Sequence, residues 1–546
     1  MDLLKLLTSA GNGTGPNTAE YTNTFAGVHD VTVLAGVEAI QNNYRCRNAS
    51  RIDFFSRDPD YMQLGSGAQS QQNDGSFSQW NLFSTFGRVS YTYNNKYLLE
   101  AVVRRDGSSR FGEENRYGVF PAASLAWRVT NEDFMSSTDN WLDNLMLRVG
   151  YGQVGNDRIG NYNSFTTYGS AQDNSFYPIS GGNTGAGSAG FYQASLGNPN
   201  VAWEITTTTN VGLDAIIFEN WEFSVDFWNR VTEDMLFPQQ IPYILGQASA
   251  PSINVGEMEN NGIDFEVGYT NTATSDELQY GFSFNISRYK NEINQLSSQA
   301  EEVLRESSFR ENFYTQAETG TQFPEFYGYV VDGIFQTQAE ADSHPEAFGG
   351  YNEEGRFKYR DVNGDGVINA DDRTYIGDPH PDFTAGLTLS FDYKGFSAST
   401  LLYASYGNDM VNYVRRWIDF NQFQGNRSTR RLYNSWGSPH LDNNENAKMP
   451  KIEGNDSNSQ LPSTYFVEDA SYLRMEQLRL GYDLNNVLNM QNVRNIRLYV
   501  QGTNLFTITG YSGLDPEVNT DGANRGIDRG AWPSSRRLMF GVDVSL

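Results

Sequence analysis

The sequence predicts an all-β protein in which one large antiparallel sheet closes as a transmembrane β-barrel. Apolar and polar residues alternate along many segments of the 546-residue chain, which gives each predicted strand one apolar and one polar face. The chain also carries 34 Phe, 32 Tyr and 9 Trp although its mean hydropathy is −0.56, so the rings need an apolar surface that the average residue does not supply. Short turns and long polar loops alternate between the strands, which is the asymmetry of outer-membrane barrels.

The alternation is clearest in residues 383–393 and 537–546. In the first segment, Phe383, Ala385, Leu387, Leu389, Phe391 and Tyr393 share one face, and Thr384, Gly386, Thr388, Ser390 and Asp392 share the other. We expect about fifteen strands, near 28–41, 78–93, 96–105, 117–129, 143–154, 161–169, 201–218, 220–231, 253–270, 278–293, 325–335, 383–394, 395–407, 466–484 and 491–506, with 536–546 closing the sheet. Several exceed the ~9–11 residues that a tilted strand needs to cross hydrocarbon, so we expect them to project beyond the membrane.

Charged residues stand in the middle of the predicted strands, on the polar face. They are Glu100, Arg104, Arg148, Asp226, Glu266, Arg479 and Asp543. A closed soluble core would not tolerate these charges unpaired, whereas a water-filled lumen would. They therefore favour a wide barrel over a compact β-sandwich.

The predicted organisation is one barrel rather than the three or four domains that the length alone would suggest. Residues 1–27 are expected to be a loop or strand remnant, and residues 28–546 the barrel. Long loops rich in Gly, Asn, Ser, Asp and Pro are expected on the extracellular side, near 170–200, 232–252, 336–382, 408–465 and 507–535. The first ten residues lack the basic start and long apolar core of a signal peptide, because Asp2 and Lys5 interrupt them. We therefore expect the chain to begin inside a longer reading frame.

Composition excludes several classes of protein. With 39 basic and 66 acidic residues the formal net charge is −27, which opposes nucleic-acid binding. The lone Cys46 cannot form an intrachain disulfide, and four His residues give little basis for a zinc or catalytic site. No stretch approaches the roughly 18 apolar residues of a transmembrane helix. We expect no enzymatic activity.

One segment has the chemistry of a metal-binding loop. In residues 361–372, oxygen donors stand at the positions of an EF-hand Ca²⁺ loop, and Gly366 stands where that loop turns sharply. The predicted ligands are Asp361, Asn363, Asp365, the carbonyl of Val367, Asn369 and Asp372. Asp372 replaces the usual bidentate Glu, and no amphipathic helices flank the loop, so we expect Ca²⁺ to stiffen an extracellular loop rather than to signal. The alternative is an Asp/Asn/Gly turn without metal.

Aromatic residues in the long loops are candidates for contact with a ligand. The three candidates are Tyr351, Trp436 and Trp532. Most other aromatic residues are expected to form the belts at the two membrane interfaces, which is the commoner use of such side chains in barrels.

Several strings resemble the SusC/RagA family of TonB-linked outer-membrane transporters. They begin with Phe86–Glu100 (FGRVSYTYNNKYLLE), Arg104–Gly112 (RRDGSSRFG), Phe120–Val129 (FPAASLAWRV) and Glu132–Met135 (EDFM). Leu196–Glu204 (LGNPNVAWE), Asn254–Glu266 (NVGEMENNGIDFE), Asp361–Gly377 and Val500–Thr507 (VQGTNLFT) follow. The strings run in family order from about residue 28 to Leu546, which makes the resemblance specific. Leu546 departs from the Phe that usually ends the family's barrel.

The resemblance implies an outer-membrane importer for oligosaccharides or peptides. Full-length members combine a signal peptide, a carboxypeptidase-like extension, a TonB box and a plug with a barrel of about 22 strands. This chain would supply the C-terminal fifteen or sixteen strands of about 22, without the plug. The family also implies a SusD-like lipoprotein over the barrel and energy from TonB acting on the plug.

A second hypothesis is a passive pore or surface adhesin that works alone. A barrel of about sixteen strands would have the width of a porin. A third, a barrel hydrolase, fails because no Ser/His/Asp or Asp/His arrangement surrounds His29, His344, His380 or His440.

Overall fold

A computed structural model describes most of the chain. The described residues are 3–14, 17–177, 187–239, 241, 244, 246, 248–271, 277–296, 303–304, 308–309, 312–421, 425–454, 456–484, 495–518, 520 and 522–545. The expected final residue Leu546, residues 491–494 of an expected strand, and parts of the expected N-terminal remnant 1–27 and of the expected loops 170–200, 232–252, 408–465 and 507–535 lie outside this set. No helix among the described residues is long and apolar enough to cross a membrane.

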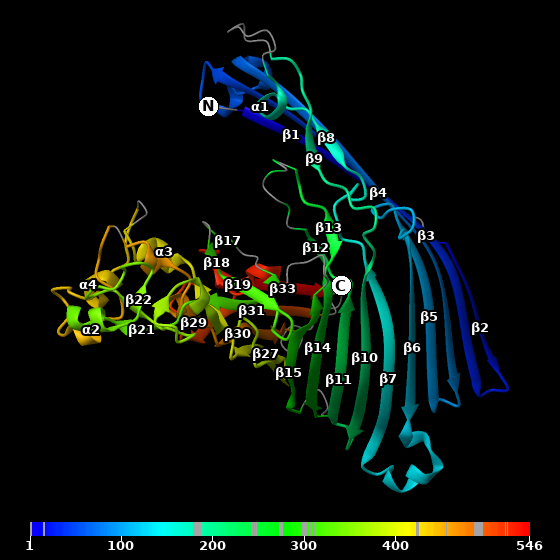
Figure 1. Cartoon of the computed structure of the whole chain (residues 1–546). Coiled ribbons are helices and arrows are strands. Elements are labelled where there is room, and N and C mark those ends of the chain that lie inside the picture. Colours follow the sequence, from blue (N-terminus) through cyan, green and yellow to red (C-terminus); the bar gives the residue numbers. More distant parts are fainter. Residues whose placement is uncertain are drawn as a thin grey trace.

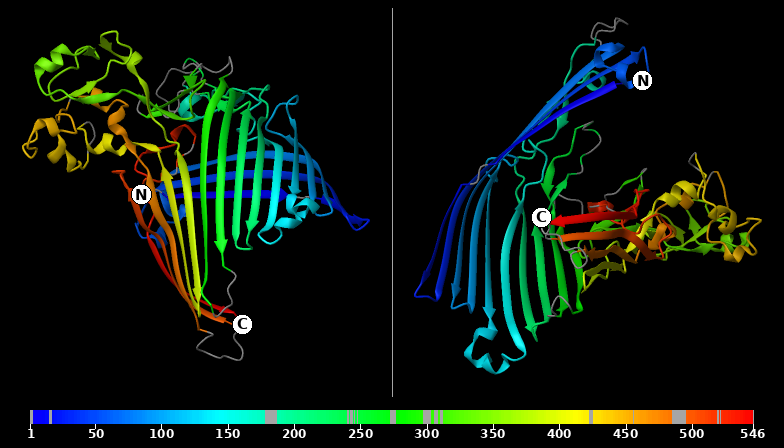
Figure 2. Two further views of the ribbon diagram at one scale, coloured as in Figure 1. Left: turned by 90° about the horizontal axis from the view of Figure 1, so that it is seen from below. Right: turned by 180° about the vertical axis from the view of Figure 1, so that it is seen from behind.

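A 16-stranded antiparallel sheet dominates the structure. Strands β1 (Leu3–Thr14) and β2 (Asn17–Phe25) both pair with β3 (His29–Phe54), at different stretches, and together form one edge. The sheet continues through β4 (Gly67–Tyr93), β5 (Tyr97–Ser108), β6 (Tyr117–Arg128), β7 (Leu142–Asn156), β10 (Glu204–Ile217), β11 (Trp221–Glu233), β14 (Gly256–Thr270), β15 (Gln279–Leu296), β26 (Phe383–Tyr393), β27 (Phe396–Tyr406), β30 (Tyr472–Asp483), β31 (Asn495–Thr509) and β33 (Arg537–Ser545). From β2 onward, and apart from short elements in the loops, strands that are neighbours in the sequence are neighbours in the sheet, so the chain runs up and down. Figures 1 and 2 show the result as a strongly curved wall, with the blue strands at one edge and the red strand at the other.

Short turns of two or three residues join several pairs of strands at one end of the wall, such as residues 94–96 between β4 and β5 and residues 394–395 between β26 and β27. Asn94 and Asn95 both have positive φ (48° and 54°), as do Lys394 and Gly395 (46° and 87°). This backbone matches the right-handed twist of a β-hairpin, and Asn and Gly adopt it more readily than other residues. Long segments leave the opposite end. The two ends therefore correspond to the periplasmic and extracellular sides expected from the sequence.

The register places apolar and charged residues on opposite faces of the wall. Val211 lies opposite Val149 on one side and Phe227 on the other, and these side chains are exposed. The next residue, Gly212, lies opposite Arg148 and Asp226, on the other face. Because the side-chain period of a strand is two, every apolar residue of the row faces outward, where a membrane supplies the apolar surroundings.

The outward face carries an apolar band of limited height. On β11 it runs from Trp221, whose ring lies 4.9 Å from that of Tyr269, up to Phe227, and Asn229 follows. The span from Trp221 to Asn229 is about 26 Å at a rise of ~3.3 Å per residue. That agrees with the apolar band of about 25 Å in outer-membrane barrels.

The strands β3 and β4 are the longest, at 26 and 27 residues. They pair from His29↔Tyr93 at the turn to Phe54↔Gly67, and Figure 1 shows the upper part of this hairpin, with β1 beside it, rising well above β5, β6 and β7. Their ends exceed the expected 28–41 and 78–93, since the sheet pairing continues outside the membrane, where both faces of the hairpin meet water.

Two expected membrane strands have a different role. Of residues 161–169, only β8 (Thr167–Gly169) is a strand, and it pairs with β9 (Tyr192–Ser195) outside the large sheet. Residues 325–335 form β20 (Glu325–Gly328) and β21 (Val331–Ile334) of small loop sheets. Alternation alone did not distinguish these short strands from membrane strands.

The long segments contain further short elements. The strands are β12 (Leu236–Pro238), β13 (Ser252–Asn254), β16 (Val303–Leu304), β17 (Ser308–Phe309), β18 (Asn312–Phe313), β19 (Thr315–Glu318), β22 (Glu346–Ala347), β23 (Phe357–Tyr359), β24 (Val367–Ile368), β25 (Thr374–Gly377), β28 (Asp409–Asn412), β29 (Val467–Asp469) and β32 (Ile527–Asp528). The helices are α1 (Gln172–Ser175), α2 (Gln338–Ser343), α3 (Val414–Ile418) and α4 (Arg430–Asn434).

Candidate functional site

Three long extracellular segments, 312–382, 407–471 and 510–536, pack together as one folded body, which we call the loop unit. Its aromatic core contains Tyr314, Phe326, Tyr329, Ala347, Tyr351, Phe357, Tyr359, Ile368, Val411, Tyr413, Phe420, Phe466 and Ile527. All three segments contribute to this core. Pairing between backbones joins the segments directly: Val411 of 407–471 pairs with Ile527 of 510–536, and Tyr329 of 312–382 pairs with Ser463 of 407–471. Figure 1 shows α2, α3, α4, β21, β22 and β29 gathered beside the wall.

Glycines permit the closest contacts within the loop unit. A Cβ on Gly526, whose φ is +73°, would lie 2.6 Å from Pro379 Cβ and 2.8 Å from Phe326 Cζ. A Cβ on Gly377 would lie 2.9 Å from Val467 Cγ1. These distances are too short for a real side chain, so the backbone of each glycine lies directly against side chains of another segment. The loop unit is thus packed as tightly as a small globular domain.

A buried ion pair lies inside the loop unit. Arg415 Nε lies 3.3 Å from Asp419 Oδ2, and Tyr465 donates a hydrogen bond of 2.9 Å to the same oxygen. The side chains of Arg415 and Asp419 are 8% and 0% exposed, and Arg415 also lies 3.2 Å from Glu468. Because a buried charge is costly without its partner, this network holds α3 against the segment that ends in β29.

The predicted Ca²⁺ loop has the backbone that its glycines suggest. Gly364 and Gly366 have φ of +78° and +87°, and both donate backbone hydrogen bonds to the carboxylate of Asp361, at 2.7 and 2.9 Å. These bonds, the one from Gly366 foremost, hold the pKa of Asp361 below its ordinary value. In the same way Asn363 Oδ1 accepts from the N–H of Asp365, and Asp365 Oδ1 accepts from that of Val367. The donor side chains therefore lie along the inside of one tight turn.

Asp372 closes this loop from a fully buried position. Its carboxylate accepts backbone hydrogen bonds from Val362 (2.9 Å) and Asn369 (2.8 Å), and no ion pair to it is present among the described residues. A buried carboxylate without a cation is unusual, since burial disfavours an unpaired charge. Within the described part of the chain, however, no group of three or more His, Cys, Asp or Glu side chains converges as a metal site would require. Half of the predicted donor set consists of neutral oxygens, from Asn363, Val367 and Asn369.

The three aromatic candidates for ligand contact differ in accessibility. Tyr351 is 3% exposed, and its hydroxyl bonds to Ser459 Oγ at 2.7 Å and accepts from the N–H of Phe357, so the structure assigns it to the core of the loop unit instead of a binding surface. Burial also raises its pKa well above the ordinary value for tyrosine. Trp436 is half-buried and donates to Gln336 Oε1 at 3.2 Å. Trp532, at 94% exposed, stands free of the surface.

The charged residues on the inner face of the wall form ion pairs between strands. Arg148 of β7 bonds to Asp214 of β10 at 2.6 Å and to Asp226 of β11 at 3.0 Å. Arg104 of β5 likewise bonds to Asp106 at 2.7 Å and to Glu38 of β3 at 2.9 Å. The sequence identified Arg104, Arg148 and Asp226 as lumen residues. It did not identify their partners, because pairing across strands depends on register.

His380 connects the loop unit to the wall, and sequence reasoning assigned it no role. Its Nδ1 lies 3.1 Å from both the hydroxyl of Tyr289 on β15 and the guanidinium of Arg525, and its Nε2 lies 3.0 Å from the carbonyl of Phe323. Since Arg525 can only donate, Nδ1 accepts, and the proton resides on Nε2. Burial lowers the pKa of His380, which favours this neutral form.

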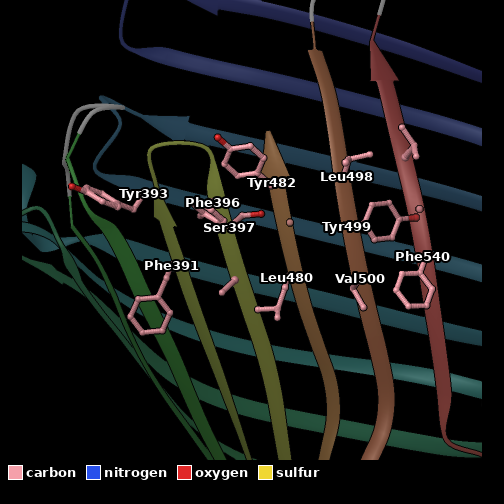
Figure 3. Close-up of a pocket in the computed structure, with 14 residues that line it drawn as sticks. Phe391, Tyr393, Phe396, Ser397, Leu480, Tyr482, Leu498, Tyr499, Val500 and Phe540 are labelled. Atoms are coloured by element: carbon pink, nitrogen blue, oxygen red, sulfur yellow. The ribbon is translucent and has the colours of Figure 1, made fainter. Parts of the chain in front are cut away.

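A large hollow lies on the outward, lipid-facing side of the last strands. It measures about 760 Å³ and is lined by residues of β26, β27, β30, β31 and β33, among them Phe391, Phe396, Leu480, Val500 and Phe540 (Figure 3). These side chains belong to the apolar face, as the register Phe391↔Ala398↔Leu480↔Val500↔Phe540 shows. The hollow therefore meets lipid and not the lumen.

Known proteins are similar to this chain in both sequence and architecture. A family model for the TonB dependent receptor-like β-barrel matches residues 6–505. The chain belongs to this family. It is 31% identical to TonB-dependent receptor P3 of Formosa agariphila over 99% of this chain and 54% of that protein, and 31% identical to TonB-dependent receptor SusC of Bacteroides thetaiotaomicron over 85% and 43%. The structure of the RagAB peptide transporter matches with a TM-score of 0.82 at 26% identity, covering 100% of this chain and 56% of that one.

The SusC/RagA resemblance, the barrel fold and the location in the outer membrane are thereby confirmed. The chain spans about half the length of the relatives that it matches.

Proposed function

We propose that the chain is the barrel portion of a TonB-dependent nutrient importer of the SusC type. The observation that carries this proposal is the two-faced wall, which presents apolar residues outward and interstrand ion pairs inward, together with a match to the RagAB peptide transporter over the whole chain. A polar inner face suits the passage of hydrated solutes. Because its charges are paired, the inner face is stable in contact with water and needs no apolar core packed against it. The cargo would be an oligosaccharide or a peptide.

The loop unit offers a surface on the extracellular side to which a partner protein would bind. It is a folded body with its own aromatic core, and the family resemblance implies a SusD-like surface lipoprotein that covers the barrel mouth. TonB would act through a plug of the full-length protein. Trp532, as the exposed aromatic candidate, and Trp436, as the half-buried one, are the proposed contacts to cargo.

Uptake by the intact protein tests this function. Cells that lack the gene are expected to lose uptake of labelled peptides or of labelled oligosaccharides, and the full-length gene is expected to restore it only when TonB is active. Large ungated conductance of the purified full-length protein in planar bilayers, with uptake unchanged in cells that lack TonB, would favour the passive pore instead.

We further propose that residues 361–372 bind Ca²⁺. The fit of the loop to this ion rests on two observations: the donor oxygens line one tight turn, and the buried carboxylate of Asp372 has no cationic partner among the described residues. Ca²⁺ accepts ~6–8 oxygen ligands in a flexible arrangement, and mixed carboxylate, amide and carbonyl donors suit it. Its role would be to stiffen the loop unit around β24.

Titration calorimetry with Ca²⁺ on the purified full-length protein tests the site. Saturable heat is expected for the wild type and none for Asp365→Ala, because Asp365 is a ligand in this register. Asp371→Ala is the matched control: it removes a carboxylate from the same turn at a position outside the ligand set, and should keep the heat. Equal heats for Asp365→Ala and the wild type would rule the site out.

A further inference from the structure

The extracellular segment between β7 and β10 is nearly free of charge. Its described part, residues 159–177 and 187–203, which we call the β8–β9 segment, contains one charged residue, Asp173. Charged residues make up 19% of the whole chain, and at that frequency this part would hold about seven. Residues 312–382 of the loop unit carry eighteen, so an extracellular position does not explain the difference. Figure 1 shows β8 and β9 above the wall, beside the hairpin of β3 and β4.

Large aromatic rings of the β8–β9 segment are exposed. The four most exposed rings are those of Phe165 (63%), Tyr168 (70%), Tyr177 (58%) and Phe191 (78%). The segment begins beyond the extracellular end of β7, so the membrane does not cover these rings as it covers the outward rings of the wall. Trp203, by contrast, is 6% exposed and packs against Phe111 and Phe120. The segment is therefore anchored by a buried ring at its base, while the rings above it form a surface of the kind that binds a ligand.

A glycine and several hydroxyl groups hold this surface in shape. A Cβ on Gly190 would lie 3.1 Å from Cε1 of Tyr177, so the tyrosine ring packs on the glycine backbone and leaves its remaining surface open. Ser175 Oγ donates a hydrogen bond of 2.9 Å to the carbonyl of Gly190, and the hydroxyl groups of Thr167 and Ser195 lie 2.6 Å apart. Because these contacts fix the segment before a ligand arrives, binding loses less conformational entropy.

The combination of aromatic rings with neutral polar groups suits a sugar. The electron-rich face of an aromatic ring attracts the C–H groups of a sugar ring. Hydroxyl and amide groups both donate and accept hydrogen bonds, as the hydroxyl groups of a sugar require. A peptide, by contrast, carries charged termini, which lose hydration on binding and need charged partners. Apart from Asp173, the β8–β9 segment has none to offer.

We infer that the β8–β9 segment binds an uncharged oligosaccharide, with the rings of Tyr177 and Phe191 stacked on sugar rings. The inference rests on the proposed import function and selects the oligosaccharide from its two classes of cargo. The site is separate from the loop unit, which carries Trp436 and Trp532.

Titration calorimetry with defined oligosaccharides on the purified full-length protein tests the inference. The neutral probes are linear hexasaccharides of glucose, mannose, xylose and galactose, and the charged probes are the hexamer of galacturonic acid and a mixture of hexapeptides. At least one neutral hexasaccharide is expected to bind, and each charged probe to bind at least about tenfold more weakly, which corresponds to ~1.4 kcal/mol.

Variants of the exposed rings test the contact itself. Tyr177→Ala combined with Phe191→Ala should weaken binding of the neutral hexasaccharide at least about tenfold, whereas Tyr177→Phe keeps the ring and should retain most of the binding. Phe134→Ala, which removes a ring that is 66% exposed at the periplasmic end, is the matched control and should leave binding unchanged. A thermal unfolding curve of the double variant that matches the wild type would show that its loss of binding is not a loss of folding.

Three results would overturn the inference. They are failure of every neutral hexasaccharide to bind, equal or tighter binding of the charged probes, and unchanged binding in the double variant. None of these results touches the proposed function if labelled peptides still enter cells in a TonB-dependent manner, because import would then proceed without the sugar site. Uptake of every cargo that is independent of TonB would instead overturn the proposed function.

Discussion

The membrane wall and the loop unit use the same aromatic residue type in opposite ways. In the wall, Phe227 and Phe540 are 57% and 78% exposed on the outward face, whereas in the loop unit Phe326 and Phe357 are 0% and 1% exposed. Rings in the wall depend on lipid for their apolar surroundings, and the wall itself is held by hydrogen bonds between strands. Rings in the loop unit supply those surroundings to one another. The two regions should therefore respond to different perturbations.

The largest expected effect comes from emptying the core of the loop unit. Phe326→Ala removes a ring that touches Gly526 from another segment, and should cost about 3–5 kcal/mol of the stability of the loop unit. Limited proteolysis should then cleave within 312–382, 407–471 or 510–536, while the heat-modifiable gel mobility of the barrel persists. Phe227→Ala is the control, since lipid fills the space that it leaves. Equal protease resistance of the two variants would contradict the division between the regions.

A charge on the lipid face should act on the wall alone. Leu213→Arg places a cation in the middle of the apolar band, opposite Val225, and should destabilise the barrel by about 2–4 kcal/mol. The measurement is reversible unfolding from lipid vesicles. Thr208→Arg places the same residue on the inner face of the same strand, where water solvates it, and should change the free energy of unfolding far less. Similar losses for both variants would mean that the two faces have been assigned wrongly.

The junction between the regions should depend weakly on pH. His380 has a pKa lowered by burial, while in the unfolded chain it titrates near the ordinary value of about 6.5. Above that pH, His380 is neutral in both the native and the unfolded state, and the stability of the loop unit is unaffected by its titration. As the pH falls through 6.5 the unfolded state takes up a proton that the native state excludes, so the loop unit should loosen. Hydrogen exchange of 312–325 at pH 7.5 and 5.5 measures this, and the change should disappear in His380→Gln but persist in His440→Gln.

Sequence analysis recovered the wall because its signal is local. Residues 383–393 alternate over the full length of β26, with the same first and last residues, because each strand meets lipid on one side and water on the other. The turn conformation of residues 361–372 was readable too, because Gly364 and Gly366 determine it locally. Binding of Ca²⁺ to that turn stays a prediction.

The packing of the three segments into the loop unit could not be predicted from the sequence. Its core joins segments that are separated by whole strands, and an aromatic residue amid Gly, Asn and Ser resembles an exposed one until its neighbours are known. Tyr351 was therefore expected at a binding surface and lies in the core, and residues 325–335 were expected in the membrane and lie outside it. The partners Asp214 of Arg148 and Glu38 of Arg104 were missed for a related reason, since only the register brings them together.

The three segments of the loop unit connect β15 to β26, β27 to β30, and β31 to β33, which has an evolutionary consequence. Surface loops commonly gain and lose residues independently of one another. Here an insertion in one segment would disturb pairings such as Tyr329 with Ser463 and Val411 with Ile527, which together join all three segments. The segments should therefore vary in length together among related proteins, and be inherited as a single module, while the segment between β7 and β10, which stands outside this core, should be free to diverge.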